Sequence, residues 1–145
     1  MIITKTPYRI SFFGGGSDYP GWYKKFGGSV LSTTIDKYIY ISCRELPPFF
    51  DHKYRIVWSK IENVKTIAEI QHLTVRKLLK YNKIKSGLEI HYDGDLPSRS
   101  GMGSSSAFTV GILNVLSKYK NINLSKKKLA NQSIHIEQKI IKEIV

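Results

Sequence analysis

The sequence predicts one α+β domain, and three observations lead to this prediction. The chain has 145 residues, 41% of them hydrophobic, which is enough for a single domain with a buried core. Residues 38–43 alternate between two faces as in a half-buried strand. After a glycine loop, Ala107, Val110 and Leu113 recur at the spacing of one face of a helix. We therefore expect residues 1–145 to mix strands with long helices.

The same periodicities and the chain breakers between them set the expected elements. We expect strands near residues 2–6, 9–13, 29–35, 38–44, 54–58 and 88–93. Helices are expected near 66–81, 104–118 and 125–144, the last of them capped by Ser125. Breakers fall at 14–16, 47–48 and 121–123. Three lysines, 126–128, oppose the helix dipole in the last helix, which favours an exposed and weak first turn.

Composition narrows the class of protein. The formal charge of +12 is spread along the chain, and its aromatic residues are not interleaved with arginines. We interpret this charge as a lysine-rich surface that attracts phosphorylated substrates, not as a nucleic-acid site. No apolar run approaches the roughly 20 residues that span a bilayer, and the first residues lack the pattern of a signal peptide. We therefore expect a cytoplasmic protein that does not enter membranes.

Cys43 is the single cysteine, which excludes an internal disulfide and a cysteine metal cluster. It shares a predicted strand face with Ile39 and Ile41, so we expect a buried structural thiol.

The most informative segment is residues 96–107, Leu-Pro-Ser-Arg-Ser-Gly-Met-Gly-Ser-Ser-Ser-Ala, between a predicted strand and a predicted helix. The first N–H groups of a helix are unpaired, and its dipole places positive charge there. Gly101 and Gly103 let the backbone approach a polyphosphate, and the serines can cap the helix, contact phosphate or hold a metal. The segment predicts a nucleotide site.

The common phosphate-loop patterns do not fit this segment. No lysine follows Gly103, as a Walker A loop requires, and Ser106 stands where a dinucleotide loop has its third glycine. On spacing alone, an ordinary serine-capped helix after a glycine turn remains an alternative.

Several segments together resemble a known family. Pro97 followed by residues 101–107 (Gly-Met-Gly-Ser-Ser-Ser-Ala) resembles the phosphate loop of the GHMP small-molecule kinases, which usually have leucine in place of Met102. Residues 6–19 and 27–38 resemble the branch that phosphorylates heptose 7-phosphates, through Gly-Gly-Gly-Ser-Asp at 14–18. Residues 134–138, Ile-His-Ile-Glu-Gln, resemble the segment that carries a magnesium-binding glutamate.

The resemblance implies a fold, a reaction and a set of site residues. The fold is the ribosomal-protein-S5-domain-2-like N-terminal half of a GHMP kinase. The reaction is ATP-dependent phosphorylation of D-glycero-D-manno-heptose 7-phosphate at the anomeric hydroxyl, giving the 1,7-bisphosphate. ATP would bind to Pro97, Gly101, Met102, Gly103, Ser104, Ser105 and Ser106, and Mg²⁺ to Glu137 with Ser104 or Ser105. The sugar phosphate would bind to Gly15, Gly16, Ser17 and Asp18, with Arg9 beside the acceptor hydroxyl.

Some features remain open or depart from the family. Tyr19, Trp22 and Tyr23 fit sugar stacking and burial in the core equally well, and Arg99 is a candidate for the substrate phosphate. The family's further aspartate and its C-terminal domain would lie beyond Val145. Because Ile144-Val145 looks like the interior of a helix, we expect an N-terminal domain truncated within that helix, with poor activity alone. Alternative functions are a kinase of fucose-like sugars and a basic RNA-binding module.

Overall fold

A single mixed sheet organises the chain. The structure is a computed structural model that describes residues 1–98 and 100–141. The sheet has the strand order β1-β2-β5-β3-β4. Its strands are β1 (Ile2–Phe13), β2 (Leu31–Glu45), β3 (Tyr54–Val57), β4 (Ile61–Val64) and β5 (Leu88–Gly94). The β3–β5 pair is parallel and the other neighbours are antiparallel.

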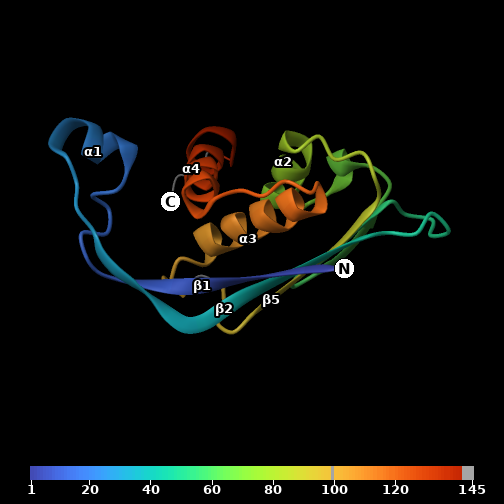
Figure 1. Cartoon of the computed structure of the whole chain (residues 1–145), viewed down its shortest axis with the longest axis horizontal. Helices are drawn as coiled ribbons and strands as arrows, with labels where there is room; N and C mark the ends of the chain where they lie inside the picture. The colour runs from blue at the N-terminus through green and yellow to red at the C-terminus, as the bar shows by residue number, and fades with distance from the viewer. Residues whose placement is uncertain (99, 142–145) are drawn as a thin grey trace.

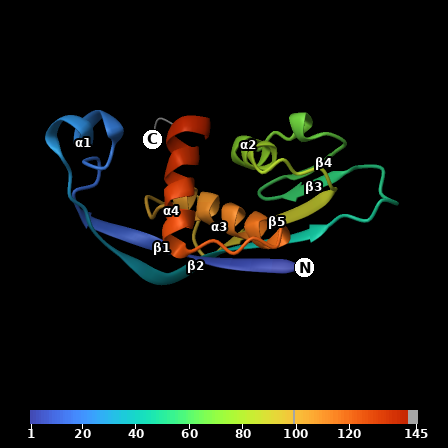
Figure 2. The ribbon, with the colours of Figure 1, turned by 45° about the horizontal axis from the view of Figure 1, so that its top comes forward.

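Three helices cover one face of this sheet, and the opposite face is open (Figure 1). They are α2 (Leu73–Tyr81), α3 (Ser104–Tyr119) and α4 (Lys126–His135), with a 3₁₀ turn η1 (Ile67–Glu69) before α2 and a π-helical segment η2 (Ile136–Ile141) after α4. The short helix α1 (Pro20–Phe26) lies apart from them, at the far end of the β1–β2 ribbon (Figures 1 and 2). The predicted α+β class is confirmed.

Two strand pairs that the sequence separates are continuous in the structure. The expected strands 2–6 and 9–13 form β1, and the expected strands 29–35 and 38–44 form β2. Their pairing shifts register between Pro7 and Arg9, where a step of two residues along β1 matches a step of four along β2, from Tyr38 to Thr34. The predicted break is therefore a bulge inside a long ribbon.

Other elements also differ from prediction. Strand β4 was not expected, because its buried residue is Glu62. The strand therefore lacks the alternation of apolar and polar residues that predicts a half-buried strand. Helix α1 was not expected because none of its residues is buried. The expected helix 66–81 is a 3₁₀ turn followed by the shorter α2, and the expected helix 125–144 changes to π-helical geometry at Ile136. The capping of α4 by Ser125 is confirmed, and Ile144-Val145 lies outside the described residues.

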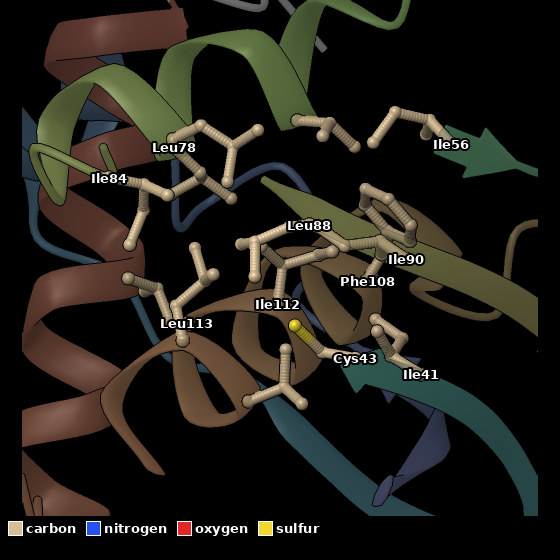
Figure 3. Packing of buried hydrophobic residues seen from close by; sticks show 14 of the residues in the cluster. Ile41, Cys43, Ile56, Leu78, Ile84, Leu88, Ile90, Phe108, Ile112 and Leu113 are labelled. Carbon is tan, nitrogen blue, oxygen red and sulfur yellow. The ribbon is translucent and has the colours of Figure 1, made fainter. Parts of the chain in front are cut away.

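The core lies between the sheet and the three helices. Ile112 and Leu113 of α3 pack with Leu78, Leu88 and other aliphatic side chains (Figure 3). Cys43 points into this core from β2, as predicted, and it is 1% exposed. Within the described ranges, no helix has the length and apolarity that crossing a bilayer requires.

The open face of the sheet carries an ion cluster centred on Glu89. The register places Arg44 of β2 and Arg55 of β3 on either side of Glu89 in β5. Both arginines form ion pairs with the Glu89 carboxylate, and His91 Nε2 lies 2.8 Å from its Oε1 atom. This cluster ties three strands together on the face that no helix covers.

We expect the Cys43 thiol to be almost unreactive in the folded protein. Burial raises its pKa to about 12, so roughly one thiol in 10⁴ is ionised at pH 8. A disulfide reagent such as DTNB should react at least about 100-fold more slowly with the native chain than with the chain in denaturant. Rapid labelling under native conditions would contradict the burial of this side chain.

The Glu89 cluster should make stability depend on acid pH. Burial alone would raise the pKa of Glu89, but hydrogen bonds from His91 and Arg44, with the Arg44 charge, lower it below 4.5. A lowered folded-state pKa contributes stability above the unfolded-state pKa, and this contribution is lost as pH falls through the folded-state value. Urea unfolding between pH 6 and 3 should show a flatter pH dependence for Glu89→Gln. The exposed Glu45→Gln serves as the control and should keep the wild-type slope.

Candidate functional site

The glycine loop before α3 has the geometry of an anion site. Gly101 and Gly103 have φ angles of +75° and +73°, a left-handed conformation that glycine adopts without strain. Gly103 is the N-cap residue of α3, and no side chain caps the helix. The serine-capped alternative is therefore wrong, because the three serines follow the cap instead of forming it. The positive end of the helix dipole therefore faces the loop, where it can attract an anion.

Arg9 lies directly beside this loop, although it precedes Gly103 by 94 positions in the sequence. Its backbone N–H donates to the Met102 carbonyl at 3.1 Å. A methyl group added at Gly103 would meet Arg9 Cγ at 3.0 Å and Nε at 3.2 Å. Arg9 Nη1 also donates to Ser11 Oγ at 3.1 Å, which helps to hold the guanidinium. A fixed positive charge thus accompanies the helix N-terminus.

A carboxylate and a hydroxyl meet at the other side of the first turn. Ser106 Oγ donates to Glu137 Oε2 at 3.4 Å, which joins α3 to the π-helical segment η2. These are hard oxygen donors of the kind that Mg²⁺ prefers. In the described part of the chain, no group of three or more His, Cys, Asp or Glu is placed to hold a metal. A magnesium ion here would therefore depend on this pair and on oxygens of a bound phosphate.

Ser104 and Ser105, which the sequence favours as metal ligands, border a cleft. The cleft has a volume of about 580 Å³. It is lined by Trp58, Ser59, His72, Thr74, Tyr92, Ser98, Ser104, Ser105 and Phe108. Its rings form a connected set, in which His72 stacks on Phe108 at 4.9 Å between ring centroids. An aromatic cleft beside an anion site suits a nucleotide base next to its phosphates.

Sequence reasoning missed the aromatic lining of this cleft. Phe108 belongs to the first turns of α3, and Tyr92 lies on the strand that leads into the loop. Aromatic residues so close to a predicted phosphate loop were the available signal. Trp58 and His72 reach the cleft through the unexpected β3–β4 hairpin and the start of α2, so no local pattern indicated them.

The second predicted site, residues 14–18, forms a tight turn at the base of α1. A methyl group at Gly14 would lie 1.9 Å from the Ser29 carbonyl oxygen, so only glycine permits this close approach. Ser17 Oγ donates to the carbonyls of Gly14 and Ser29, and the Gly16 N–H donates to Asp18 Oδ1 at 3.0 Å. Gly15 has open space around it. These contacts hold the turn against Ser29, just before β2.

Asp18 and Ser17 border a hollow of about 380 Å³ beside this turn. Tyr23 also lines it, together with Gly27, Gly28, Ser29 and Val30. Tyr19, Trp22 and Tyr23 are 42%, 53% and 38% exposed, so the alternative that buries them in the core is wrong. Pro97 is exposed just before the glycine loop, and the candidate Arg99 lies outside the described residues.

Comparison with known sequences identifies a family for most of the chain. The family model for the GHMP kinases N terminal domain matches residues 64–144. D-glycero-alpha-D-manno-heptose 7-phosphate kinase of Campylobacter jejuni is 29% identical over 147 residues, covering 94% of this chain and 43% of that protein. Galactokinase of Pyrococcus furiosus is 28% identical over 135 residues, covering 89% of this chain and 37% of that protein. The chain therefore spans less than half the length of these relatives.

Solved structures share the fold. A D-glycero-D-manno-heptose 1-phosphate kinase from Bacteroides thetaiotaomicron superposes with a TM-score of 0.82 at 21% identity, over 98% of this chain and 49% of that one. Mevalonate kinase from Methanococcus jannaschii gives a TM-score of 0.72 at 21% identity, over 96% of this chain and 46% of that one.

Two glycine substitutions in the loop should differ in their effect. Alanine at Gly101 or Gly103 adopts a left-handed conformation, which costs about 1–2 kcal/mol in either position. Space is open at Gly101, whereas the methyl group of Gly103→Ala also contacts Arg9. The free energy of unfolding of Gly103→Ala should therefore fall by about 1 kcal/mol more than that of Gly101→Ala. Urea unfolding of the two variants measures this difference. Equal losses would mean that Arg9 does not pack on the loop.

Proposed function

This chain belongs to the GHMP kinase family, and we propose that its protein transfers the γ-phosphoryl group of ATP to D-glycero-D-manno-heptose 7-phosphate at the anomeric hydroxyl. The observation that carries the proposal is the glycine loop with the Arg9 guanidinium against Gly103. A heptose 7-phosphate kinase is 29% identical over 94% of this chain, and residues 14–18 carry the Gly-Gly-Gly-Ser-Asp form of that branch; both support this substrate. The product would be the 1,7-bisphosphate.

The nucleotide would lie across the start of α3. The N-terminus of α3 after Gly103 would receive the β- and γ-phosphates, because the helix dipole places positive charge there. Ser106 and Glu137 would hold Mg²⁺, with Ser104 and Ser105 close enough in sequence to offer further hydroxyls. Bound there, the metal would neutralise charge on the phosphates. The base would enter the cleft between Trp58, His72 and Phe108.

The acceptor sugar would bind at the residue 14–18 turn. Asp18 would accept hydrogen bonds from sugar hydroxyls, and Gly15, Gly16 and Ser17 would offer backbone groups in a turn without bulky side chains. Arg9 would stabilise negative charge as it develops between donor and acceptor. Phosphoryl transfer depends mainly on such positioning and charge stabilisation. No covalent intermediate with the protein is needed.

The proposal is tested on the protein purified from its natural source, whose intact mass is compared with the 16.6 kDa of this chain. With Mg-ATP, we expect phosphorylation of heptose 7-phosphate at least tenfold faster than of unphosphorylated fucose or galactose. Faster phosphorylation of an unphosphorylated sugar would show that the proposed substrate is wrong. Absence of any kinase activity would show that the proposed reaction is wrong. In the last case, RNA affinity that falls steeply with salt would favour the binding-module alternative.

Asp18→Asn should separate sugar binding from nucleotide binding. Loss of a charged hydrogen-bond acceptor costs about 1.5–3 kcal/mol, so KM for the sugar should rise about 10- to 150-fold. KM for ATP should not change. Asp36→Asn, at an exposed position of β2, is the matched control and should behave like the wild type. An equal rise in both KM values for Asp18→Asn would contradict a specific role in sugar binding.

A further inference from the structure

We infer that Glu62 is a positioning residue for the nucleotide base, because it holds Trp58 and the start of α2 together as one wall of the aromatic cleft. This inference rests on the proposed function, since the cleft is the base site only if the protein binds ATP. Glu62 does not line the cleft itself. It would act through the residues that do.

Glu62 is 7% exposed and faces inward from β4. Its Oε1 atom accepts from the indole Nε1 of Trp58 at 2.9 Å and from the backbone N–H of His72 at 3.1 Å. Its Oε2 atom accepts from the backbone N–H of Gln71. One side chain therefore joins the turn after β3 to the two residues that precede α2.

These bonds place two rings of the cleft wall. Trp58 and His72 meet edge to face at 4.9 Å, and His72 stacks on Phe108 at 4.9 Å with the planes 24° apart. Phe108 lies on α3 four residues after Ser104, which is one helical turn. Contacts between rings therefore connect Trp58, which is hydrogen-bonded to Glu62, with the helix whose N-terminus would receive the phosphates. A shift of Trp58 or His72 would change where a base sits relative to those phosphates.

Glu62 places a carboxylate at a position of the sheet that faces the core. Its cross-strand partner is Ile56, which is buried in the core. An apolar residue of similar volume would fill this position, but a buried donor that loses its acceptor costs about 1–3 kcal/mol. What an apolar residue cannot do is accept hydrogen bonds from Trp58, Gln71 and His72. The acceptor geometry therefore points to the wall of the cleft as the reason for Glu62.

The test uses Glu62→Gln in the full protein. Glutamine keeps the shape but turns one acceptor oxygen into an N–H₂ donor, which must face a donor on Trp58 or on the backbone. The chain has two tryptophans, so a Trp22→Phe background leaves Trp58 as its reporter; any tryptophan outside this chain is replaced by Phe as well. Glu69→Gln is the matched control, because Glu69 accepts from Thr66 and Lys65 but does not line the cleft.

For Glu62→Gln we expect about tenfold weaker ATP binding, unchanged binding of inorganic tripolyphosphate, and greater quenching of Trp58 by acrylamide. KM for ATP should rise while kcat stays close to that of the wild type. Glu69→Gln should change none of these. If the reporter protein binds ATP and Glu62→Gln binds it equally well, the inference fails. If the reporter protein binds no ATP at all, the proposed function fails instead.

A second variant covers the case in which Glu62→Gln does not fold. Trp58→Phe keeps an aromatic ring but removes the indole N–H that Glu62 accepts. We expect a several-fold loss of ATP affinity by calorimetry, with tripolyphosphate binding unchanged. Equal affinities of Trp58→Phe and wild type for ATP would overturn the role of this hydrogen bond in placing the wall.

Discussion

Packing of helix α3 on the sheet is the constraint on which the candidate nucleotide site depends. Nine of its 16 residues are buried, including Ile112 and Leu116, which are fully covered. Thr4 of β1 donates its hydroxyl to the Gly111 carbonyl at 3.1 Å, and a methyl group at Gly111 would meet Ile41 at 2.8 Å. Because the helix approaches the sheet this closely, its N-terminus has one position. That position sets Gly103 against Arg9.

The site is assembled across the chain, and each long-range contact has a local cause. The register shift in the β1–β2 ribbon falls between Pro7 and Arg9, and bulges of this kind turn side chains in new directions. Arg9 is also the residue whose N–H binds the loop through Met102. At the opposite side, π-helical geometry begins at Ile136, so Glu137 meets Ser106 within it. Irregular backbone thus occurs where the candidate ligands converge.

The sequence predicted what depends on local pattern and missed what depends on packing. Helix α3, the core position of Cys43 and the Ser125 cap follow from periodicity and capping chemistry, and the structure agrees. Strand β4 was missed because Glu62 faces inward, which apolar alternation cannot anticipate. Which serine meets Glu137 depends on the rotation of α3 relative to η2. Only tertiary packing sets that rotation, so the sequence favoured Ser104 or Ser105 as the hydroxyl near Glu137 and placed Ser106 only with the nucleotide.

The two candidate sites differ in how the fold supports them. Strand β2 pairs with β5 only from Ile39 to Glu45, whereas its pairing with β1 extends to Leu31 and Phe13. Beyond Ile39 the sheet is therefore a two-stranded ribbon, a form that gains little support from neighbouring strands. The Gly14–Asp18 turn and α1 lie at the end of this ribbon, outside the core. The glycine loop, by contrast, begins a helix that the core holds. Changes at the Gly14–Asp18 turn can therefore alter the proposed sugar site while leaving the packed candidate nucleotide site intact.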